Sequence, residues 1–360
     1  MYPFDLSALA RPELETLIPY NVPVSTARVR LADNENPYDF PEEVRELIFK
    51  AALNAEFNRY PDPNADRLRE KIAEYLDVPS DYITVGNGSD ELIMSAMLAF
   101  GAGAAFAVAT PTFSMYGIHG QVAGAKGIAV PRLADFSLDV ARLSTVAADP
   151  KVKLIVLCNP NSPTGNLTPP EIIERILAKS NAVVLVDEAY AEFSGITVAP
   201  LLGRYPNLVI LRTFSKAFSL AGLRVGYLLA TGAVLRELLK VKPPYNLNAF
   251  SQIAALTVLE HRHLFQTRVK AILIQREKLL EGMAALPGVE VFPTVTNFIL
   301  FSTKLPSLQV YNALIERGVQ LRYLNDPALA ACLRVTVGTE KENAAFLSAL
   351  KEIISANGDQ

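Results

Sequence analysis

The chain has 360 residues, of which 50% are hydrophobic and 20% charged, with a formal net charge of −3. This length exceeds that of one ordinary domain, so we expect two lobes. Lysine and arginine are spread along the chain without a basic block, which argues against nucleic acid or an acidic membrane as partner. We find no signal-peptide pattern or membrane-length apolar stretch, and the two cysteines, Cys158 and Cys332, lie in apolar runs. We therefore expect a cytoplasmic protein.

The first 30 residues are rich in proline and lack sustained periodicity, which predicts an arm that lies on another surface. Helical patterns follow at Pro41–Asn54 and Ala65–Tyr75, and the first opens with proline and two glutamates, as helix N-termini prefer. Short apolar runs rich in β-formers then alternate with amphipathic segments. We expect strands at Tyr82–Val85, Ala105–Ala109, Leu154–Leu157, Ala182–Val186, Leu208–Arg212 and Arg224–Leu229, and helices at Glu91–Phe100, Pro170–Lys179 and Ala233–Leu239.

Continuous apolar strands separated by helices are typical of a mostly parallel sheet covered on both faces, that is, of an α/β fold. After Pro243-Pro244 the pattern changes to a long helical region followed by shorter mixed elements, which predicts a smaller α+β domain. We predict an N-terminal arm at 1–30, a large domain at 31–245 and a small domain at 246–360. The elements expected in the small domain are helices at Phe250–Leu286 and Glu342–Ile354, and strands at Val289–Phe292, Asn297–Phe301, Val319–Tyr323 and Leu333–Val337.

Polar side chains end several of the expected strands, at the sheet edge where open α/β folds bind ligands. Lys216 follows one strand in a setting of small and apolar residues, and Arg224 lies eight residues further on. A loop lysine is usually solvated, but a partly desolvated lysine near another cation becomes an imine-forming nucleophile. Asp187 directly follows four apolar residues. It is either a cap or a carboxylate that keeps a pyridinium nitrogen protonated.

The segment Gly86-Asn-Gly-Ser-Asp-Glu91 joins an expected strand to a helix, where glycines and the helix N-terminus could hold a phosphate. A plain capped turn fits this segment equally well, and no Walker lysine follows it. Phe113 and Tyr116 follow another strand, where an aromatic ring would either stack on a cofactor or pack in the core. The three histidines show no metal-ligand spacing, so we expect no metal.

With these residues in place, the chain resembles the fold-type I pyridoxal-phosphate aminotransferases, and most closely the histidinol-phosphate aminotransferases. The resemblance covers about residues 31–338. The segments that carry it, in chain order, are Asn34-Glu-Asn-Pro37, Arg59-Tyr-Pro-Asp-Pro63, Gly86-Asn-Gly-Ser-Asp-Glu91, Asn159-Pro-Asn-Ser-Pro-Thr-Gly165, Val186-Asp-Glu-Ala-Tyr190, Thr213-Phe-Ser-Lys-Ala-Phe-Ser-Leu-Ala-Gly-Leu-Arg224 and Leu333-Arg-Val-Thr-Val-Gly-Thr-Glu340.

The resemblance implies a large sheet of the seven-stranded type and a site for pyridoxal 5′-phosphate. Lys216 would carry the cofactor as an imine and move the substrate proton, and Asp187 would pair with the pyridine nitrogen. Asn159 and Tyr190 would bind the ring 3′-oxygen, and Phe113 would stack on the ring in place of the commoner tyrosine. The residues expected around the cofactor phosphate are Gly88, Ser89, Asp90, Ser215, Arg224 and, from a neighbouring subunit, Tyr60.

A contribution from the neighbouring subunit implies a homodimer with shared active sites. Arg334 would anchor substrate anions, since a guanidinium fork suits carboxylate and phosphate alike. Arg322, Tyr20 and Asn36 would complete the substrate pocket. The implied reaction converts histidinol phosphate and 2-oxoglutarate, both small molecules, into imidazole-acetol phosphate and glutamate.

Three alternatives remain open from the sequence. An aromatic amino acid aminotransferase would share nearly every cofactor residue and differ in the substrate pocket alone. A threonine-phosphate decarboxylase-like enzyme would keep the lysine and release carbon dioxide. A non-catalytic regulator built on the same fold would need an additional basic DNA-binding domain, for which the chain has neither room nor charge.

Overall fold

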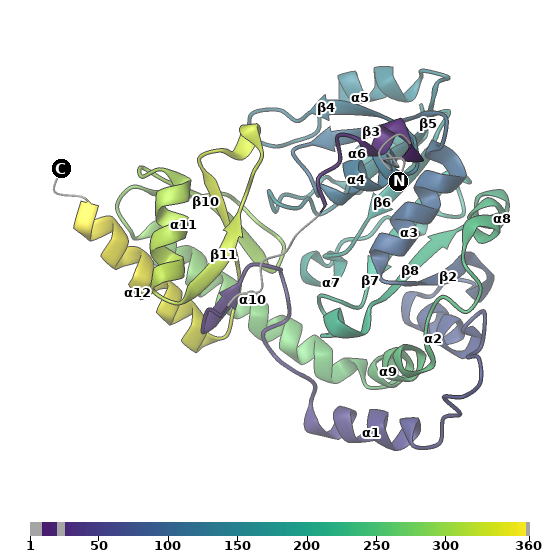
Figure 1. The fold of residues 1–360 in the computed structure, drawn as a ribbon, viewed down its shortest axis with the longest axis horizontal. Coiled ribbons are helices and arrows are strands. Elements are labelled where there is room, and N and C mark those ends of the chain that lie inside the picture. Colours follow the sequence, from purple (N-terminus) through teal and green to yellow (C-terminus); the bar gives the residue numbers. More distant parts are fainter. Residues whose placement is uncertain (1–8, 20–25, 358–360) are drawn as a thin grey trace, which may run out of the picture.

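The computed structural model describes residues 9–19 and 26–357, which form two β-sheets with helices around them (Figure 1). The larger sheet has seven strands in the order β2-β8-β7-β6-β5-β3-β4, and the smaller has five in the order β1-β11-β12-β10-β9. Strands of the larger sheet are β2 (Ile83–Asn87), β3 (Ala105–Thr110), β4 (Lys126–Pro131), β5 (Val152–Cys158), β6 (Val183–Asp187), β7 (Leu208–Thr213) and β8 (Val225–Ala230). Strands of the smaller sheet are β1 (Val29–Leu31), β9 (Val289–Val291), β10 (Phe298–Thr303), β11 (Val319–Tyr323) and β12 (Cys332–Thr336).

The α-helices cover both sheets. They are α1 (Glu42–Ala52), α2 (Asp66–Leu76), α3 (Ser89–Ala96), α4 (Met115–Val122), α5 (Val140–Ala147), α6 (Pro170–Leu177), α7 (Ala191–Ser194), α8 (Gly232–Val241), α9 (Ala249–Glu260), α10 (Arg262–Ala284), α11 (Ser307–Glu316) and α12 (Glu340–Asn357). A single π-helical turn, Met97–Gly101, continues α3.

The larger sheet confirms the predicted α/β class. All of its strands run parallel except β8, which is antiparallel to both β2 and β7. Successive residues of β5 contribute to different apolar clusters: Leu154 and Val156 pack on the side of α3, α4 and α8, whereas Ile155 packs on the opposite side. Burial on both faces explains why these strands read as continuous apolar runs.

The smaller sheet is antiparallel apart from β1, which pairs in parallel with β11, with Val29 opposite Val319. Figure 1 shows α10 running from the seven-stranded sheet to the five-stranded one. The helical region predicted as one stretch is therefore two helices, with His261 between them. The predicted boundaries at residues 30 and 245 stay predictions.

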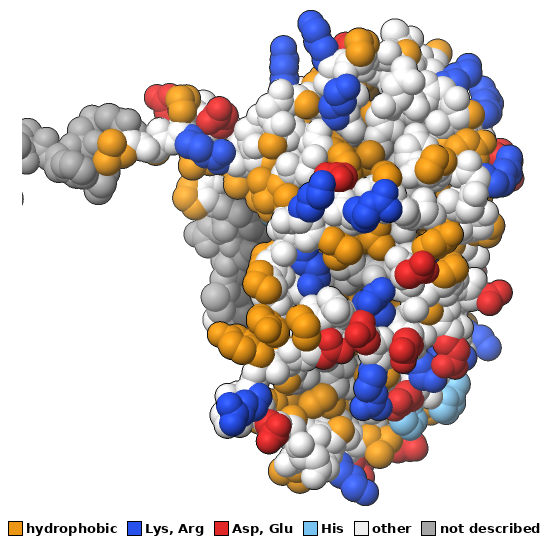
Figure 2. All heavy atoms as spheres, turned by 90° about the vertical axis from the view of Figure 1, so that its right-hand side faces the viewer, with side chains coloured by type: hydrophobic (Ala, Val, Ile, Leu, Met, Phe, Trp, Pro, Cys, Tyr) orange, Lys and Arg blue, Asp and Glu red, His pale blue; other side chains and the backbone are white. Residues whose placement is uncertain are grey.

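One face of the molecule shows no single dominant charge. Figure 2 shows the face that lies on the right of Figure 1, where hydrophobic side chains are exposed among charged side chains of both signs. Among residues 9–19 and 26–357, no helix has both the length and the apolar character needed to cross a membrane.

Candidate active site

A cleft of roughly 810 Å³ opens where β5, β6 and β7 end. Because these strands are parallel and in register, with Cys158 opposite Asp187, their carboxyl ends meet at one edge of the sheet. The smaller sheet and the segment before α1 close the other side. Of the predicted site residues, the cleft is lined by Ser89, Asp90, Phe113, Asp187, Tyr190, Ser215, Lys216, Arg224, Arg322 and Arg334.

Lys216 follows β7 and reaches into the cleft, where its Nζ donates a hydrogen bond of 2.7 Å to the carbonyl oxygen of Asp33. Burial and the nearby cation of Arg334 lower the pKa of Lys216 to about 8. An amine with a pKa in this range has a substantial neutral fraction at physiological pH, and the neutral amine is the nucleophile.

Asp187 is the last residue of β6, and its side chain is almost fully buried. Its Oδ1 accepts a hydrogen bond from the backbone N–H of Ala189 (3.0 Å), and its Oδ2 accepts one from the Tyr116 hydroxyl (2.7 Å). Burial raises the pKa of Asp187 to about 6, whereas these hydrogen bonds oppose the rise. A carboxylate buried in this way favours a positively charged ligand group.

The turn before α3 is shaped to admit an anion. Gly88 has φ +81°, and a Cβ at this position would lie 2.6 Å from the Arg224 guanidinium. Arg224 itself donates to the Asp90 carboxylate (3.1 Å) and lines the cleft. The first turn of α3 adds N–H groups without intrahelical acceptors, which together with the arginine suit a phosphate.

Tyr190 and the two predicted anion-binding arginines are held by the segment before α1. The Tyr190 hydroxyl accepts a hydrogen bond from Asn34 Nδ2 (2.8 Å). Arg334 is buried, and donates to Ser162 Oγ (3.1 Å) and to the carbonyl of Ala32 (2.6 Å). Arg322 lies nearer solvent, with NH1 3.7 Å from the Asp33 carboxylate. The two guanidinium groups thus lie on the smaller-sheet side of the cleft.

Two predicted site residues, Asn159 and Asn36, are not among the residues that line the cleft, and their side chains make hydrogen bonds elsewhere. The Asn159 carboxamide donates to the Thr168 carbonyl (3.0 Å) and accepts from the Thr168 N–H (2.7 Å), so both its nitrogen and its oxygen bond within its own loop. The Asn36 carboxamide donates to the carbonyl of Ala217 and accepts from the N–H of Tyr38. Both side chains stabilise the loops around the site and do not line it.

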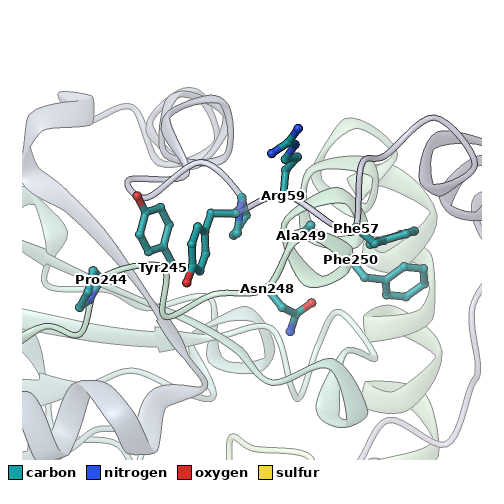
Figure 3. A pocket seen from close by; sticks show the side chains of 9 residues that line it. Phe57, Arg59, Pro244, Tyr245, Asn248, Ala249 and Phe250 are labelled. Carbon is teal, nitrogen blue, oxygen red and sulfur yellow. The ribbon is translucent and has the colours of Figure 1, made fainter.

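Tyr60 lies outside this cleft, with 80% of its surface exposed. Its ring stacks on Tyr245 with centroids 4.4 Å apart, at the edge of a second pocket. Figure 3 shows this pocket, with Tyr245 on one side and Phe57 and Phe250 on the other. Tyr20 falls outside the described residues.

The structure also shows contacts at the cleft that the sequence did not indicate. Asn34 reaches Tyr190, Ser162 is the residue of the 159–165 loop that faces Arg334, and Tyr116 contacts Asp187. Asn34 and Ser162 do lie in segments that carried the family resemblance. Nothing in the sequence, however, indicates which member of a loop turns inward.

The residues present fit pyridoxal phosphate: a lysine amine, a buried carboxylate and an anion-binding turn open onto one cleft of suitable size. Fold and site together define a pyridoxal-phosphate-dependent enzyme of fold type I. A family model for class I and II aminotransferases matches residues 26–350, and the chain belongs to this family.

Several relatives extend this similarity over nearly the whole chain. A histidinol-phosphate aminotransferase of Carboxydothermus hydrogenoformans is 44% identical over 339 residues, covering 94% of this chain and 96% of the relative. That of Thermoanaerobacter pseudethanolicus is 41% identical over 348 residues, covering 96% and 99%. The crystal structure of the Sinorhizobium meliloti enzyme in complex with pyridoxal-5′-phosphate superposes with a TM-score of 0.89 at 23% identity, covering 99% of both chains.

Proposed function

We propose that this aminotransferase moves an amino group between histidinol phosphate and 2-oxoglutarate, yielding imidazole-acetol phosphate and glutamate. One observation carries the proposal: Lys216 and Asp187 share a cleft with two arginines, Arg322 and Arg334, on its far side. The names of relatives that are 41–44% identical support histidinol phosphate as the donor.

When bound, pyridoxal phosphate supplies an aldehyde and a protonated ring that accepts electrons from the substrate. The Asp187 carboxylate offers the negative charge that keeps a proton on the ring nitrogen. Lys216 Nζ, with its pKa lowered to about 8, would accept the proton that leaves the α-carbon of the amino donor and hold it within the cleft. Arg334 orients the anionic end of the substrate, and its own position is fixed by Ser162 and Ala32.

A donor competition tests the proposal. Purified protein is supplied with 2-oxoglutarate and either histidinol phosphate or phenylalanine, and glutamate formation is followed. We expect kcat/KM to favour histidinol phosphate by at least about 100-fold, because a site built for a polar group rejects analogues that lack it. Faster turnover of phenylalanine would make the protein an aromatic aminotransferase, and release of carbon dioxide from threonine phosphate without an acceptor would make it a decarboxylase. Lys216→Ala, the control, should abolish turnover of both donors.

We further propose that two chains form a homodimer in which each supplies Tyr60 to the other's cofactor phosphate, as the family resemblance implies. Large hydrophobic side chains are exposed at the pocket of Tyr60 and Tyr245: Phe57 lines it and is 61% exposed, and Phe49, whose ring packs against Phe250 of the same pocket, is 58% exposed. Such a cluster is unusual on the surface of a monomer and typical of an interface. A cytoplasmic location remains a prediction, supported by two buried cysteines that form no disulfide.

A further inference from the structure

A buried phenol lies behind the carboxylate that faces the cofactor ring. Tyr116 belongs to α4, its side chain is 0% exposed, and its hydroxyl is 2.7 Å from Asp187 Oδ2 although the two residues are 71 positions apart. We propose that Tyr116 is a positioning residue, whose hydroxyl holds the Asp187 carboxylate in place and in its anionic form for the cofactor ring nitrogen. The inference rests on the pyridoxal-phosphate chemistry of the proposed function and is independent of the amino donor.

The packing of α4 places the phenol at this point. Gly120, one turn after Tyr116, faces Phe106 of β3 so closely that a Cβ would lie 2.3 Å from the phenylalanine ring. The absence of a side chain therefore lets α4 approach the sheet. This approach carries the Tyr116 hydroxyl to the end of β6, where Asp187 lies.

Asp187 is held by two hydrogen bonds that serve different oxygens. The Ala189 N–H comes from the same loop and binds Oδ1, whereas Tyr116 comes from a different part of the sheet and binds Oδ2. Only 4% of Asp187 is exposed, so water has little access to replace either donor. The Tyr116 hydroxyl thus fixes Oδ2, the oxygen of Asp187 that the Ala189 N–H does not bind.

Tyr116 also has an electrostatic role, because burial raises the pKa values of both Asp187 and Tyr116. Burial raises the pKa of Asp187 to about 6, and the Tyr116 hydrogen bond is the largest influence that lowers it again. Burial also raises the pKa of Tyr116 well above its usual value, so the phenol stays protonated and can only donate to the carboxylate. The other titratable groups that act on this pair are Asp90 from α3, Glu188 after β6, Cys158 at the end of β5 and Arg132 after β4.

The ring of Tyr116 also contacts Phe113, the residue expected to stack on the cofactor ring. The ring meets Phe113 edge to face, with centroids 5.5 Å apart and an interplanar angle of 84°, and Phe113 lines the cleft. Replacement by phenylalanine would keep this ring contact and remove the hydroxyl alone. Tyr116→Phe therefore separates the hydrogen bond from the packing.

The chain offers a matched control in Tyr227. It is also almost fully buried, at 1% exposed, and within the described part of the chain its hydroxyl has no hydrogen-bond partner. Tyr227→Phe removes a buried hydroxyl at the same change in size without touching Asp187. Any general effect of losing a phenol oxygen from the core should occur in both variants.

The experiment measures two quantities without any amino donor. The pKa of Asp187 is followed in the apoprotein by 13C NMR of its carboxyl carbon, and the Kd for pyridoxal phosphate is measured from pH 6 to pH 9. In Tyr116→Phe we expect the protonation constant of Asp187 to rise about tenfold, equivalent to about 1.4 kcal/mol. The cofactor Kd relative to wild type should then rise about fivefold at pH 6 and about twofold at pH 7, and should return to the wild-type value at higher pH, where Asp187 ionises in both proteins. Tyr227→Phe should match wild type.

An unchanged Asp187 pKa in Tyr116→Phe would overturn the proposal, as would a cofactor Kd weakened equally at every pH, since that would indicate a merely structural role. If Tyr116→Phe does not fold, 3-fluorotyrosine at position 116 provides the second test: the more acidic phenol is a stronger donor and should lower the pKa of Asp187. An error in the proposed donor would leave all these readouts unchanged, so the two failures can be told apart.

Discussion

At the residue scale, the lowered pKa of Lys216 sets the pH at which its amine becomes reactive. Because burial and Arg334 bring that pKa to about 8, from an ordinary value of 10.5, we expect amine acylation of the apoprotein at Lys216 to rise with pH around a midpoint of about 8. Mass spectrometry of the labelled peptide measures this midpoint. Arg334→Gln removes the neighbouring cation and should shift the midpoint upward. A midpoint near 10.5 in the unmodified protein would contradict the environment described for this lysine.

Asp187 should make the stability of the apoprotein depend on pH. Its folded-state pKa of about 6 lies above the ordinary 3.8, so the folded state binds the proton more tightly, and the resulting stability is present below about pH 4 and lost as pH rises through 6. The loss is on the order of 3 kcal/mol for this fully buried group. Asp187→Asn cannot titrate, so its unfolding free energy relative to wild type should increase by this amount between pH 4 and pH 7.

Urea unfolding of both apoproteins across that range checks the prediction for Asp187. If the difference in unfolding free energy between wild type and Asp187→Asn stays constant from pH 4 to pH 7, burial does not raise the pKa of Asp187. Addition of pyridoxal phosphate should stabilise wild type more than Asp187→Asn at pH 7, because the ring cation offsets the buried charge only where an anion is present.

At the element scale, a buried ion network fixes the turn that carries Asp187 and Tyr190. Arg212 on β7 donates to Glu188 (3.0 Å) and to Glu192 (3.2 Å), and all three side chains are less than 10% exposed. Arg212→Ala would leave two buried carboxylates without their cation and should cost about 3–5 kcal/mol of unfolding free energy. The exposed pair of Arg204 and Glu174 serves as control, since Arg204→Ala should cost less than about 1 kcal/mol.

Thermal and urea unfolding of the two variants measure this contrast. The Arg212→Ala protein should also bind pyridoxal phosphate more weakly, because the loop after β6 loses its anchor, while Arg204→Ala keeps the affinity of wild type. Equal stability losses in the two variants would rule out a structural role for the network.

Strands and helices could be predicted from the sequence where their apolar residues follow the spacing of that structure. Elements without such a pattern could not. Six of the seven strands of the large sheet were recognised as apolar runs, whereas β4 was missed because this edge strand is largely exposed and begins with lysine and glycine. Helix α4 was missed as well, since Gly117 and Gly120 weaken its helical pattern. Tyr116 was noted as an aromatic residue after a strand, but its role was not predicted, because its helix was not recognised and its contact with Asp187 joins distant parts of the chain.

Within the site, the sequence identified the chemistry better than it identified the orientation of loop residues. Asp187 ends β6 and Lys216 follows closely after β7, and the carboxyl ends of neighbouring parallel strands lie at one edge of the sheet. Asn159 and Ser162 belong to one irregular loop, in which hydrogen bonds with Thr168 turn the asparagine away and leave the serine beside Arg334. Such competition among local hydrogen bonds has no periodic signal in the sequence.

At the scale of the whole molecule, two regions bear on how chains of this protein assemble: residues 9–19 and the exposed hydrophobic side chains around Tyr60. Residues 9–19 lie against α4, where Gln121 donates to the carbonyl of Glu13 and to Thr16, and Arg11 donates to the carbonyl of Val122. Leu9 and Ile18 nevertheless remain 69% and 86% exposed. Exposed apolar groups on this segment and around Tyr60 are consistent with burial against a second copy of the chain.

A hybrid dimer tests whether active sites are shared. Chains carrying Lys216→Ala and Tyr60→Phe are co-expressed with different tags, and the mixed dimer is isolated. If Tyr60 acts on the neighbouring site, the intact Lys216 of one chain meets the intact Tyr60 of the other, so the hybrid should hold pyridoxal phosphate at one site with wild-type affinity. The Tyr60→Phe homodimer should bind it about tenfold more weakly, since a hydrogen bond to a charged phosphate contributes about 1.5–3 kcal/mol.

The hybrid of wild type with Lys216→Ala is the matched control, because it too has one complete site. If Tyr60 instead acted within its own chain, the only lysine-bearing site of the test hybrid would lack the hydroxyl. That hybrid would then lose cofactor as readily as the Tyr60→Phe homodimer, and the shared-site arrangement would be wrong. Since Tyr60 stacks on Tyr245 outside its own cleft, we expect the hybrid to behave like the control.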